Sequence, residues 1–351
     1  MDLEAARELP KAVLHDHLDG GLRVETLIEL AARAGYSGLP SYDAAELADA
    51  MFQGGSGSLR HYLDSFTHTV AVMQTAPAIE QVAYEAGIDH HGDGVVYAEL
   101  RLGPSLLTEV GLSREEVIES ALLGLRRAAS ETGLVFGLLI SAIRQYHDSD
   151  AVAAAAVNYV GEGVVGFDLA GREIGYPVED HLPALHRARE HGLGISLHAG
   201  EAAGTGSIAA ALGKGGAQRL GHGVRIIDDC KVDHGEITAL GSLATRVRDQ
   251  RIPLEVAISS NIHTGLAPDA ASHPFGMLYR AGFNVSINTD NRLMSRVSMS
   301  SEVTLAAESH NLAISDIGVI TLGALQAGFG DWEQRQRLID EVVTPAYAAT
   351  T

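Results

Sequence analysis

The sequence predicts a parallel (β/α)8 barrel, the TIM-barrel fold, with extra helices inserted between its first and second strands. Three observations favour this fold. Eight short apolar runs recur along the chain, amphipathic helical patterns lie between them, and metal-binding or proton-transferring residues stand where several runs end. A length of 351 residues would suit roughly two domains, but barrels of this size are often one domain. No linker or internal repeat divides the chain, so we expect one domain over residues 1–351.

The eight apolar runs are short, and most are rich in β-branched residues. We predict strands at Ala12–His17, Val95–Leu102, Phe136–Ile143, Val164–Leu169, Gly194–His198, Arg219–Gly223, Pro253–Ser259 and Asn284–Asn288. Amphipathic patterns predict helices at Arg114–Thr132, Val178–His191, Lys231–Arg251, Pro268–Ala281 and within the tail Ser298–Tyr347. Strands that are buried on both faces are apolar almost throughout, as these runs are, so helices should cover the sheet.

The segment from Gly21 to Gly94 is too long for one crossover between neighbouring strands. Part of it, Ser58–Gln74, carries apolar residues at helical spacing: Leu59, Tyr62, Leu63, Phe66 and Met73. Packing in the core is the simpler interpretation of this stripe. In a barrel, however, a segment between strands one and two lies at the C-terminal mouth, where it could cover an active site and line an apolar pocket.

The chain is acidic, with a formal net charge of −20. This charge disfavours binding to a nucleic-acid backbone or an anionic membrane, and a small-molecule ligand suits it better. The one cysteine, Cys230, leaves no disulfide within the chain, which suits a reducing compartment. The acidic start at Met1–Glu4 does not resemble a signal peptide, and no apolar run reaches the ~18 residues of a membrane-spanning helix. We therefore expect a cytoplasmic protein.

Metal-binding residues concentrate in three strings at predicted strand ends: His15-Asp16-His17, His198-Ala199-Gly200-Glu201 and Asn288-Thr289-Asp290-Asn291. Side chains alternate faces along a strand, so His15 and His17 project to the same side. Two imidazoles on one face make half of a zinc or iron site. Because the carboxyl ends of barrel strands meet at one mouth, His198 and Asp290 can complete a set of three imidazoles and one carboxylate. Such a set can hold one zinc and leave a position for water.

Further polar residues fall at the same predicted mouth. Glu201 lies three residues past His198, so we expect it near the metal but not on it. His222 ends the sixth predicted strand, where it could orient or deprotonate a water molecule at the metal, and Gly171 follows the fourth strand. The fourth strand does not end in a lysine that could bridge two metals, so a single metal ion is favoured.

Several other histidines have simpler explanations. His90 and His91 end a predicted helix, where a partial positive charge suits the helix dipole. His181, His186 and His191 lie on a helix that we expect to be exposed. A cytidine-type zinc deaminase site is excluded, because its Pro-Cys-x-x-Cys signature needs two cysteines.

Five strings resemble, in order, the motifs of the adenosine deaminase family: His15-Asp16-His17-Leu18-Asp19-Gly20, Gly166-Phe167-Asp168-Leu169-Ala170-Gly171, His198-Ala199-Gly200-Glu201, Leu220-Gly221-His222-Gly223 and Asn288-Thr289-Asp290. They span nearly the whole chain, and their joint occurrence is highly specific. The resemblance implies a zinc-dependent barrel enzyme of purine salvage. Such an enzyme converts adenosine and 2′-deoxyadenosine to inosine and deoxyinosine, with release of ammonia.

The resemblance also implies roles for the matching residues. Glu201 would protonate the purine N1, and His222 would position the attacking hydroxide. One zinc ion per chain would be held by His15, His17, His198 and Asp290.

Contacts to the nucleoside are implied as well. Asp19 would bind a ribose hydroxyl, His17 would also face the substrate, and the backbone N–H of Gly171 would reach N3. The family usually has a second Asp after the zinc-ligand Asp, where this chain has Asn291. We expect the Asn291 amide to donate to the purine N7. The alternative is that Asn291 only caps the following loop.

Two more departures lie near the mouth. Ala257-Ile258 stands where the family has Cys-Pro, and Leu102-Gly103 stands where it has Phe-Ala. These departures and the long insertion keep an alternative substrate open, a 5′-modified 6-aminopurine nucleoside such as aminodeoxyfutalosine. A second alternative is a non-catalytic relative that binds a nucleoside or a growth-factor partner.

Overall fold

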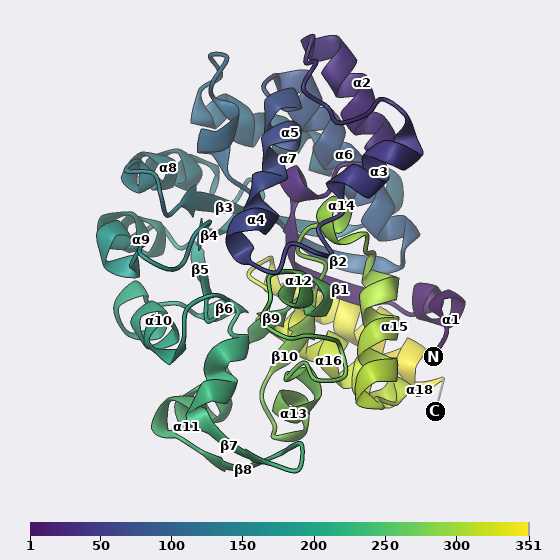
Figure 1. Cartoon of the computed structure of the whole chain (residues 1–351), viewed down its shortest axis with the longest axis vertical. Coiled ribbons are helices and arrows are strands. Elements are labelled where there is room, and N and C mark those ends of the chain that lie inside the picture. The colour runs from purple at the N-terminus through teal and green to yellow at the C-terminus, as the bar shows by residue number, and fades with distance from the viewer. Residues whose placement is uncertain (350–351) are drawn as a thin grey trace.

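The computed structural model describes residues 1–349 and confirms the (β/α)8 barrel. Eight parallel strands follow the order β1-β2-β3-β4-β5-β6-β9-β10, and helices surround them (Figure 1). Their bounds are Lys11–His17, Val95–Leu102, Val135–Ile143, Val164–Ala170, Gly194–Ala199, Arg219–His222, Leu254–Val256 and Val285–Ile287. No helix in this described part of the chain is long and apolar enough to cross a membrane.

The barrel closes between its last strand and its first. The backbone N–H of His17 donates to the Asp290 carbonyl at 2.7 Å, and that of Asp290 donates to the His15 carbonyl at 2.9 Å. Just below, the side-chain oxygen of Asn288 accepts from the N–H of Leu14 at 2.8 Å. This pairing places the first and last metal-binding strings side by side.

The outer helices are α6 (Ala76–Gly92), α7 (Arg114–Thr132), α8 (Ser149–Ala156), α9 (Leu182–Glu190), α10 (Thr205–Ala210), α11 (Ser242–Asp249), α13 (Phe275–Arg280), α15 (Met299–His310) and α16 (Ile314–Ala327). Of these, α8 and α10 were not predicted, α11 and α13 begin later than predicted, and the others lie within the stretches expected to be helical. Local signals fix the ends of α7, which begins at a capping box between Ser113 and Glu116 and ends at the left-handed Gly133, with φ 80°. The tail is helical as predicted, with α17 (Trp332–Arg337), a π-helical turn (Leu338–Val343) and α18 (Thr344–Ala348).

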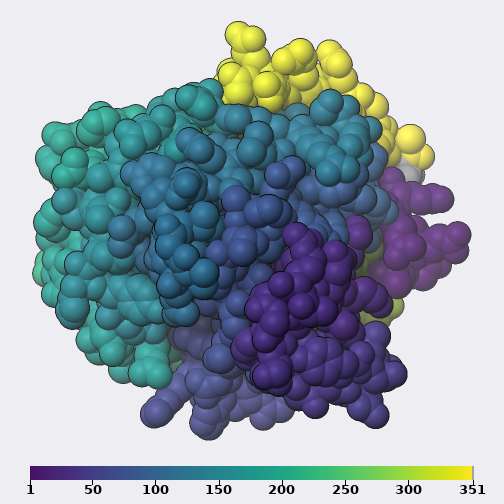
Figure 2. Space-filling model, turned by 90° about the horizontal axis from the view of Figure 1, so that it is seen from above, coloured from purple at the N-terminus to yellow at the C-terminus, as the bar shows by residue number. Residues whose placement is uncertain are grey.

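The insertion after β1 is helical, as predicted. It contains α2 (Val24–Ala34), α3 (Ala44–Met51), α4 (Leu59–Asp64) and α5 (Phe66–Val72). In Figure 2 the insertion, purple to blue, forms one continuous part of the surface beside the teal segments that follow it. The apolar stripe over Ser58–Gln74 serves both expected purposes, because Met73 is fully buried whereas Leu59 and Tyr62 line the cavity described below.

The helix predicted over Lys231–Arg251 is wrong in its first half. The chain there forms an antiparallel hairpin of β7 (Cys230–Asp233) and β8 (Glu236–Leu240) before α11 begins. The two loop residues, His234 and Gly235, have φ of 48° and 77°. Positive φ at both central residues is the requirement of a tight hairpin turn, and it ends any helix.

Three other boundaries also differ from the prediction. The strand over Pro253–Ser259 stops at Val256, where its pairing with β10 stops, and α12 (Ile258–His263) begins. The helix over Pro268–Ala281 begins only at Phe275, directly after Pro274. The helix over Val178–His191 starts as a 3-10 turn at Val178–His181. His181 is therefore 3% exposed rather than on an exposed helix, and its Nδ1 lies 3.0 Å from the Ser149 hydroxyl.

Candidate active site

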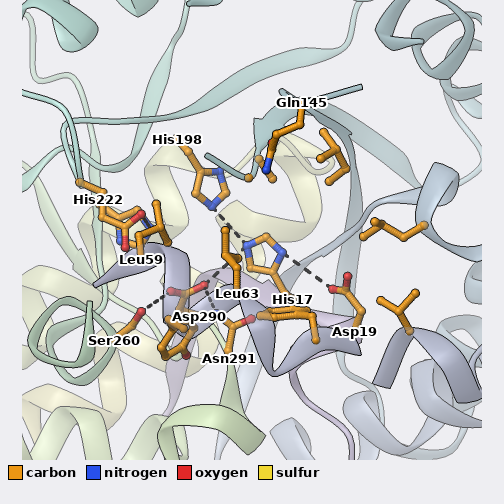
Figure 3. A pocket seen from close by; sticks show the side chains of 18 of the residues that line it. His17, Asp19, Leu59, Leu63, Gln145, His198, His222, Ser260, Asp290 and Asn291 are labelled. Carbon is orange, nitrogen blue, oxygen red and sulfur yellow. Dashed lines mark hydrogen bonds and ion pairs between the residues drawn. The ribbon is translucent and has the colours of Figure 1, made fainter. Parts of the chain in front are cut away.

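A cavity of about 200 Å³ opens at the carboxyl ends of the barrel strands. Its polar wall comes from the ends of β1, β5, β6 and β10, and its apolar wall comes largely from α4 and α5 (Figure 3). All the sequence-predicted site residues line it except His15, which lies buried beneath it. His90, His91, His181, His186 and His191 do not line it.

Four donor atoms converge at the floor of this cavity. The Nε2 atoms of His15 and His17 are 3.2 Å apart, and those of His17 and His198 are 3.3 Å apart. The Oδ1 atom of Asp290 lies 3.5 Å and 3.6 Å from the Nε2 atoms of His15 and His17. Donors about 2.0–2.1 Å from a tetrahedral zinc are separated by about 3.3 Å from one another. These four distances suit a single zinc-sized site. Three of the donors, from His15, His17 and Asp290, form one group of possible metal ligands, and His198 joins this group through His17.

Buried carboxylates aim two of these imidazoles. Glu255 accepts from Nδ1 of His15 at 3.1 Å, and Asp168 accepts from Nδ1 of His198 at 3.0 Å. With the proton on Nδ1, each Nε2 lone pair faces the shared point, as metal binding requires. Burial would raise the pKa of Asp168, but the nearby charges of His198 and Arg101 outweigh it and hold that pKa well below its usual range.

A network of buried ions lies beneath the donor set and holds these carboxylates. Arg101 pairs with Glu255 and, at 3.1 Å, with Asp168. Arg219 pairs with Glu255 at 2.6 Å and with Glu99 at 2.5 Å. All five side chains are at most 1% exposed, so each charge depends on its partners for stabilisation.

Glu201 sits in a tight loop after β5. The loop is held by Glu173, whose carboxylate accepts from the backbone N–H groups of Gly200, Ala202 and Ala203 at 2.6–2.8 Å and of Glu201 at 3.2 Å. Burial, followed by the charges of Asp290 and Glu173, raises the pKa of Glu201 well above its usual range. This environment therefore favours the protonated form of the Glu201 carboxyl group.

Two of the predicted site residues have an unusual backbone conformation. His222 and Asp290 have φ of 62° and 57°, a left-handed conformation that residues other than glycine rarely adopt. Such conformations cost free energy and cluster at functional sites. They turn His222 towards Glu201, with 3.6 Å between Nε2 and Oε2, and turn Asp290 to accept from the Ser260 hydroxyl at 2.5 Å.

The three residues expected to contact substrate also face the cavity. Gly171 has a φ of 88°, which strains any other residue, and a Cβ there would also lie 2.3 Å from Oε1 of Gln145. Asp19 is 3% exposed, and burial raises its pKa to about 7. Asn291 donates to Oδ1 of Asp290 at 2.7 Å and makes no side-chain cap on α14 (Arg292–Ser295). The capping interpretation of Asn291 is therefore wrong.

Sequence reasoning missed several groups at this site. The roles of Glu173, Ser260 and Gln145 were not foreseen, because none lies in a string of metal-binding residues. The position of Glu173 shortly after β4, at the mouth, was the available signal. Of the departures from the family pattern, Asn291 lines the cavity, whereas Leu102, Ala257 and Ile258 are fully buried and do not line it.

Comparisons with known proteins agree with this geometry. A family model described as adenosine deaminase matches residues 10–345. An adenosine deaminase of Mycobacterium marinum is 47% identical over 352 residues, which cover 99% of this chain and 97% of that protein. The solved Arabidopsis ADAL, complexed with IMP, is 27% identical with a TM-score of 0.84 and covers 99% of this chain and 100% of its own.

A more distant likeness concerns the fold alone. An amidohydrolase of Burkholderia ambifaria, solved with bound Zn, is 23% identical with a TM-score of 0.83 and covers 99% of this chain and 93% of its own. The sequence motifs, the barrel and the donor set at its mouth thus agree with a match that extends over nearly the whole chain. The chain belongs to the adenosine deaminase family of hydrolytic enzymes.

Proposed function

We propose that this enzyme hydrolyses adenosine and 2′-deoxyadenosine to inosine and deoxyinosine, with release of ammonia. The observation that carries this proposal is the pairing of a metal-donor set with a buried, protonatable carboxyl group, Glu201, in one cavity. Hydrolysis at C6 of a purine needs both a nucleophile and an acid, because the aromatic ring resists attack.

We further propose that the metal is zinc, one ion per chain, held by His15, His17, His198 and Asp290. Zinc supplies one piece of chemistry when bound, since it lowers the pKa of water from 15.7 to about 7 and so provides hydroxide at neutral pH. Three nitrogen donors and one oxygen donor at the observed spacing support this choice.

The chain's own residues carry the rest of the reaction. Glu201 donates a proton to N1, which makes C6 electrophilic. A C–O bond forms at C6. The proton of the attacking hydroxyl then passes to the exocyclic nitrogen, the bond from C6 to that nitrogen breaks as the C6 carbonyl forms, and the nitrogen leaves as ammonia. His222 holds the attacking oxygen in place.

Other residues bind and orient the nucleoside. Asp19 binds a ribose hydroxyl, His17 faces the substrate, the Gly171 N–H reaches N3, and the Asn291 amide donates to N7. The apolar residues of α4 cover the base and exclude water from it. Because Cys230 leaves no internal disulfide, we also place the enzyme in the cytoplasm.

A substrate panel tests this function. Purified enzyme is incubated with adenosine, 2′-deoxyadenosine and aminodeoxyfutalosine, and kcat/KM is followed by ammonia release and by loss of the adenine absorbance. We expect the highest kcat/KM for adenosine. A clear preference for the 5′-modified nucleoside would replace adenosine as the substrate, and no ammonia from any of them would indicate a binding protein.

A further inference from the structure

A chain of three buried side chains runs from His222 away from the cavity, and no part of the proposed reaction uses its far end. Nδ1 of His222 lies 3.1 Å from Nδ2 of Asn261, and Oδ1 of Asn261 lies 3.3 Å from Nε2 of His273. His273 in turn accepts at Nδ1 from the backbone N–H of Phe275 at 3.1 Å. All three side chains are at most 1% exposed, so the chain is shielded from bulk solvent.

The backbone N–H of Phe275, at the end of this row of side chains, determines which ring nitrogen of each histidine carries the proton. A backbone N–H can only donate, so Nδ1 of His273 carries no proton, and an imidazole must then carry one on Nε2. That N–H donates to the Asn261 carbonyl oxygen, which leaves the Asn261 amide group facing His222. The amide nitrogen also only donates, so Nδ1 of His222 accepts and its proton is on Nε2.

We propose that Asn261 and His273 are positioning residues that hold His222 in the Nε2–H tautomer, so that His222 donates a hydrogen bond to the oxygen that attacks C6. This proposal rests on the proposed function and decides between two roles for His222. With its proton already on Nε2, the side chain orients and stabilises the attacking oxygen rather than accepting a proton from it.

The same tautomer distinguishes the role of His222 from that of the residues proposed to bind the metal. Within residues 1–349, His222 belongs by distance to a possible ligand group with His15 and His198. Its Nδ1 lone pair is occupied by Asn261 and its Nε2 carries a proton, so neither nitrogen can bind a metal. His15 and His198 differ, because their Nδ1 atoms face the carboxylates of Glu255 and Asp168. An imidazole whose Nδ1 faces an acceptor keeps its proton on Nδ1, so its Nε2 can bind a metal. An imidazole whose Nδ1 faces a donor carries its proton on Nε2 and can only donate a hydrogen bond from that atom.

Nitrogen NMR tests the tautomer directly, without substrate. In 15N-histidine-labelled, zinc-loaded enzyme, long-range 1H–15N correlations distinguish a protonated ring nitrogen from a bare one, and a His222→Gln sample identifies the signals of His222. We expect a protonated Nε2 and a bare Nδ1. A proton on Nδ1 would overturn the proposal whatever the substrate proves to be. Absence of adenosine turnover would instead overturn the proposed function.

Asn261→Asp tests the consequence for the reaction. A carboxylate only accepts, so His222 should move its proton to Nδ1 in this variant. We expect the reversed tautomer, unchanged zinc content, and kcat lower by about 10²–10⁴-fold with KM within about threefold. An unchanged tautomer, or a reversed tautomer with unchanged kcat, would contradict the proposal. The control is His181→Gln, which removes a buried, hydrogen-bonded histidine outside the cavity and should leave both readouts as in the wild type.

A second pair of variants applies if Asn261→Asp does not fold. His273→Leu removes the donor that orients the Asn261 amide, so both tautomers of His222 should appear and kcat should fall. His273→Gln keeps an N–H donor at this position and should restore the Nε2–H tautomer and most of kcat. Equal behaviour of the two variants would show that His273 acts only through packing.

Discussion

At the residue scale, the hydrogen-bond partner at Nδ1 of each imidazole determines whether the nitrogen that faces the cavity can donate or accept. His15 and His198 have a carboxylate at Nδ1, whereas His222 has an amide. The three rings lie close together, with centroids 4.6–5.3 Å apart. Side chains of one type can thus have different roles within one site, because tautomers follow hydrogen-bond partners.

Glu201→Gln tests the proposed general acid. Glutamine keeps the shape but has no acidic proton for N1, so we expect kcat to fall by at least about 10²-fold. Zinc content should not change, because Glu201 is not among the donors at the floor. Steady-state kinetics with elemental analysis measures both quantities, and Glu162→Gln, at an exposed ion pair with Arg126, serves as the control. A loss below about tenfold would assign Glu201 a supporting role instead.

Asn291 provides a test of purine recognition. Its Nδ2 donates to Asp290, and its Oδ1 is buried without a hydrogen-bond partner. If the amide also donates to N7, a 7-deaza inhibitor should bind worse than its parent by ~1–3 kcal/mol, because a donor is left unpaired. The measurement is a pair of inhibition constants in wild type and in Asn291→Ala. The same 7-deaza penalty in both proteins would show that Asn291 does not recognise N7.

At the scale of elements, a buried lysine joins the first helix to the barrel. Nζ of Lys11, in β1, donates to the backbone carbonyls of Ala6 at 2.5 Å, Leu9 at 2.7 Å and Arg7 at 3.3 Å. These carbonyls lie at and just beyond the end of α1 (Leu3–Glu8), where no further helical turn can satisfy them. The Lys11 side chain therefore caps the C-terminal end of α1 and attaches this helix to the first strand.

We predict that Lys11→Met destabilises the fold. Methionine fills a similar volume but leaves these carbonyls without a donor, which costs roughly 1–3 kcal/mol in the free energy of unfolding. Denaturant unfolding measures this change. Lys231→Met is the matched control, because Lys231 lies exposed in β7, and it should have little effect. Equal stability of the two variants would show that the Lys11 contacts contribute nothing.

At the scale of the whole molecule, the metal-donor set joins distant parts of the barrel. His15 and His17 come from β1, His198 from β5, and Asp290 from the residues after β10. A ligand that binds the native state and not the unfolded chain stabilises the fold by mass action. A metal at this point would therefore hold the closing strands β10 and β1 together as well as serve the reaction.

We accordingly predict that zinc removal lowers the melting temperature. Calorimetry is run on enzyme as purified, after chelation, and after zinc is restored, and we expect a fall that zinc reverses. In Asp290→Ala the difference between chelated and zinc-supplemented protein should shrink, because one of four donors is lost. Identical melting temperatures before and after verified zinc removal would refute a structural contribution of the metal.

The sequence by itself determined the barrel and the residues gathered at its mouth, because both depend on local pattern. Strand runs and helix periods repeat within a few residues, and His15 and His17 share a face by the period of a strand alone. Local pattern failed at Lys231–Arg251, where apolar residues at mixed spacing fitted a helix until two left-handed residues, His234 and Gly235, made a hairpin.

Only the tertiary structure decided which side chains face the Nδ1 atoms of the imidazoles of the site. The carboxylate that orients His15 belongs to Glu255, 240 residues away, and the amide behind His222 belongs to Asn261, 39 residues away. No local pattern encodes such pairs, because they exist only once the barrel brings separate strand ends together. Burial is equally a property of the folded chain, and it is burial that raises the pKa of Glu201, as the proposed role of this residue as an acid requires.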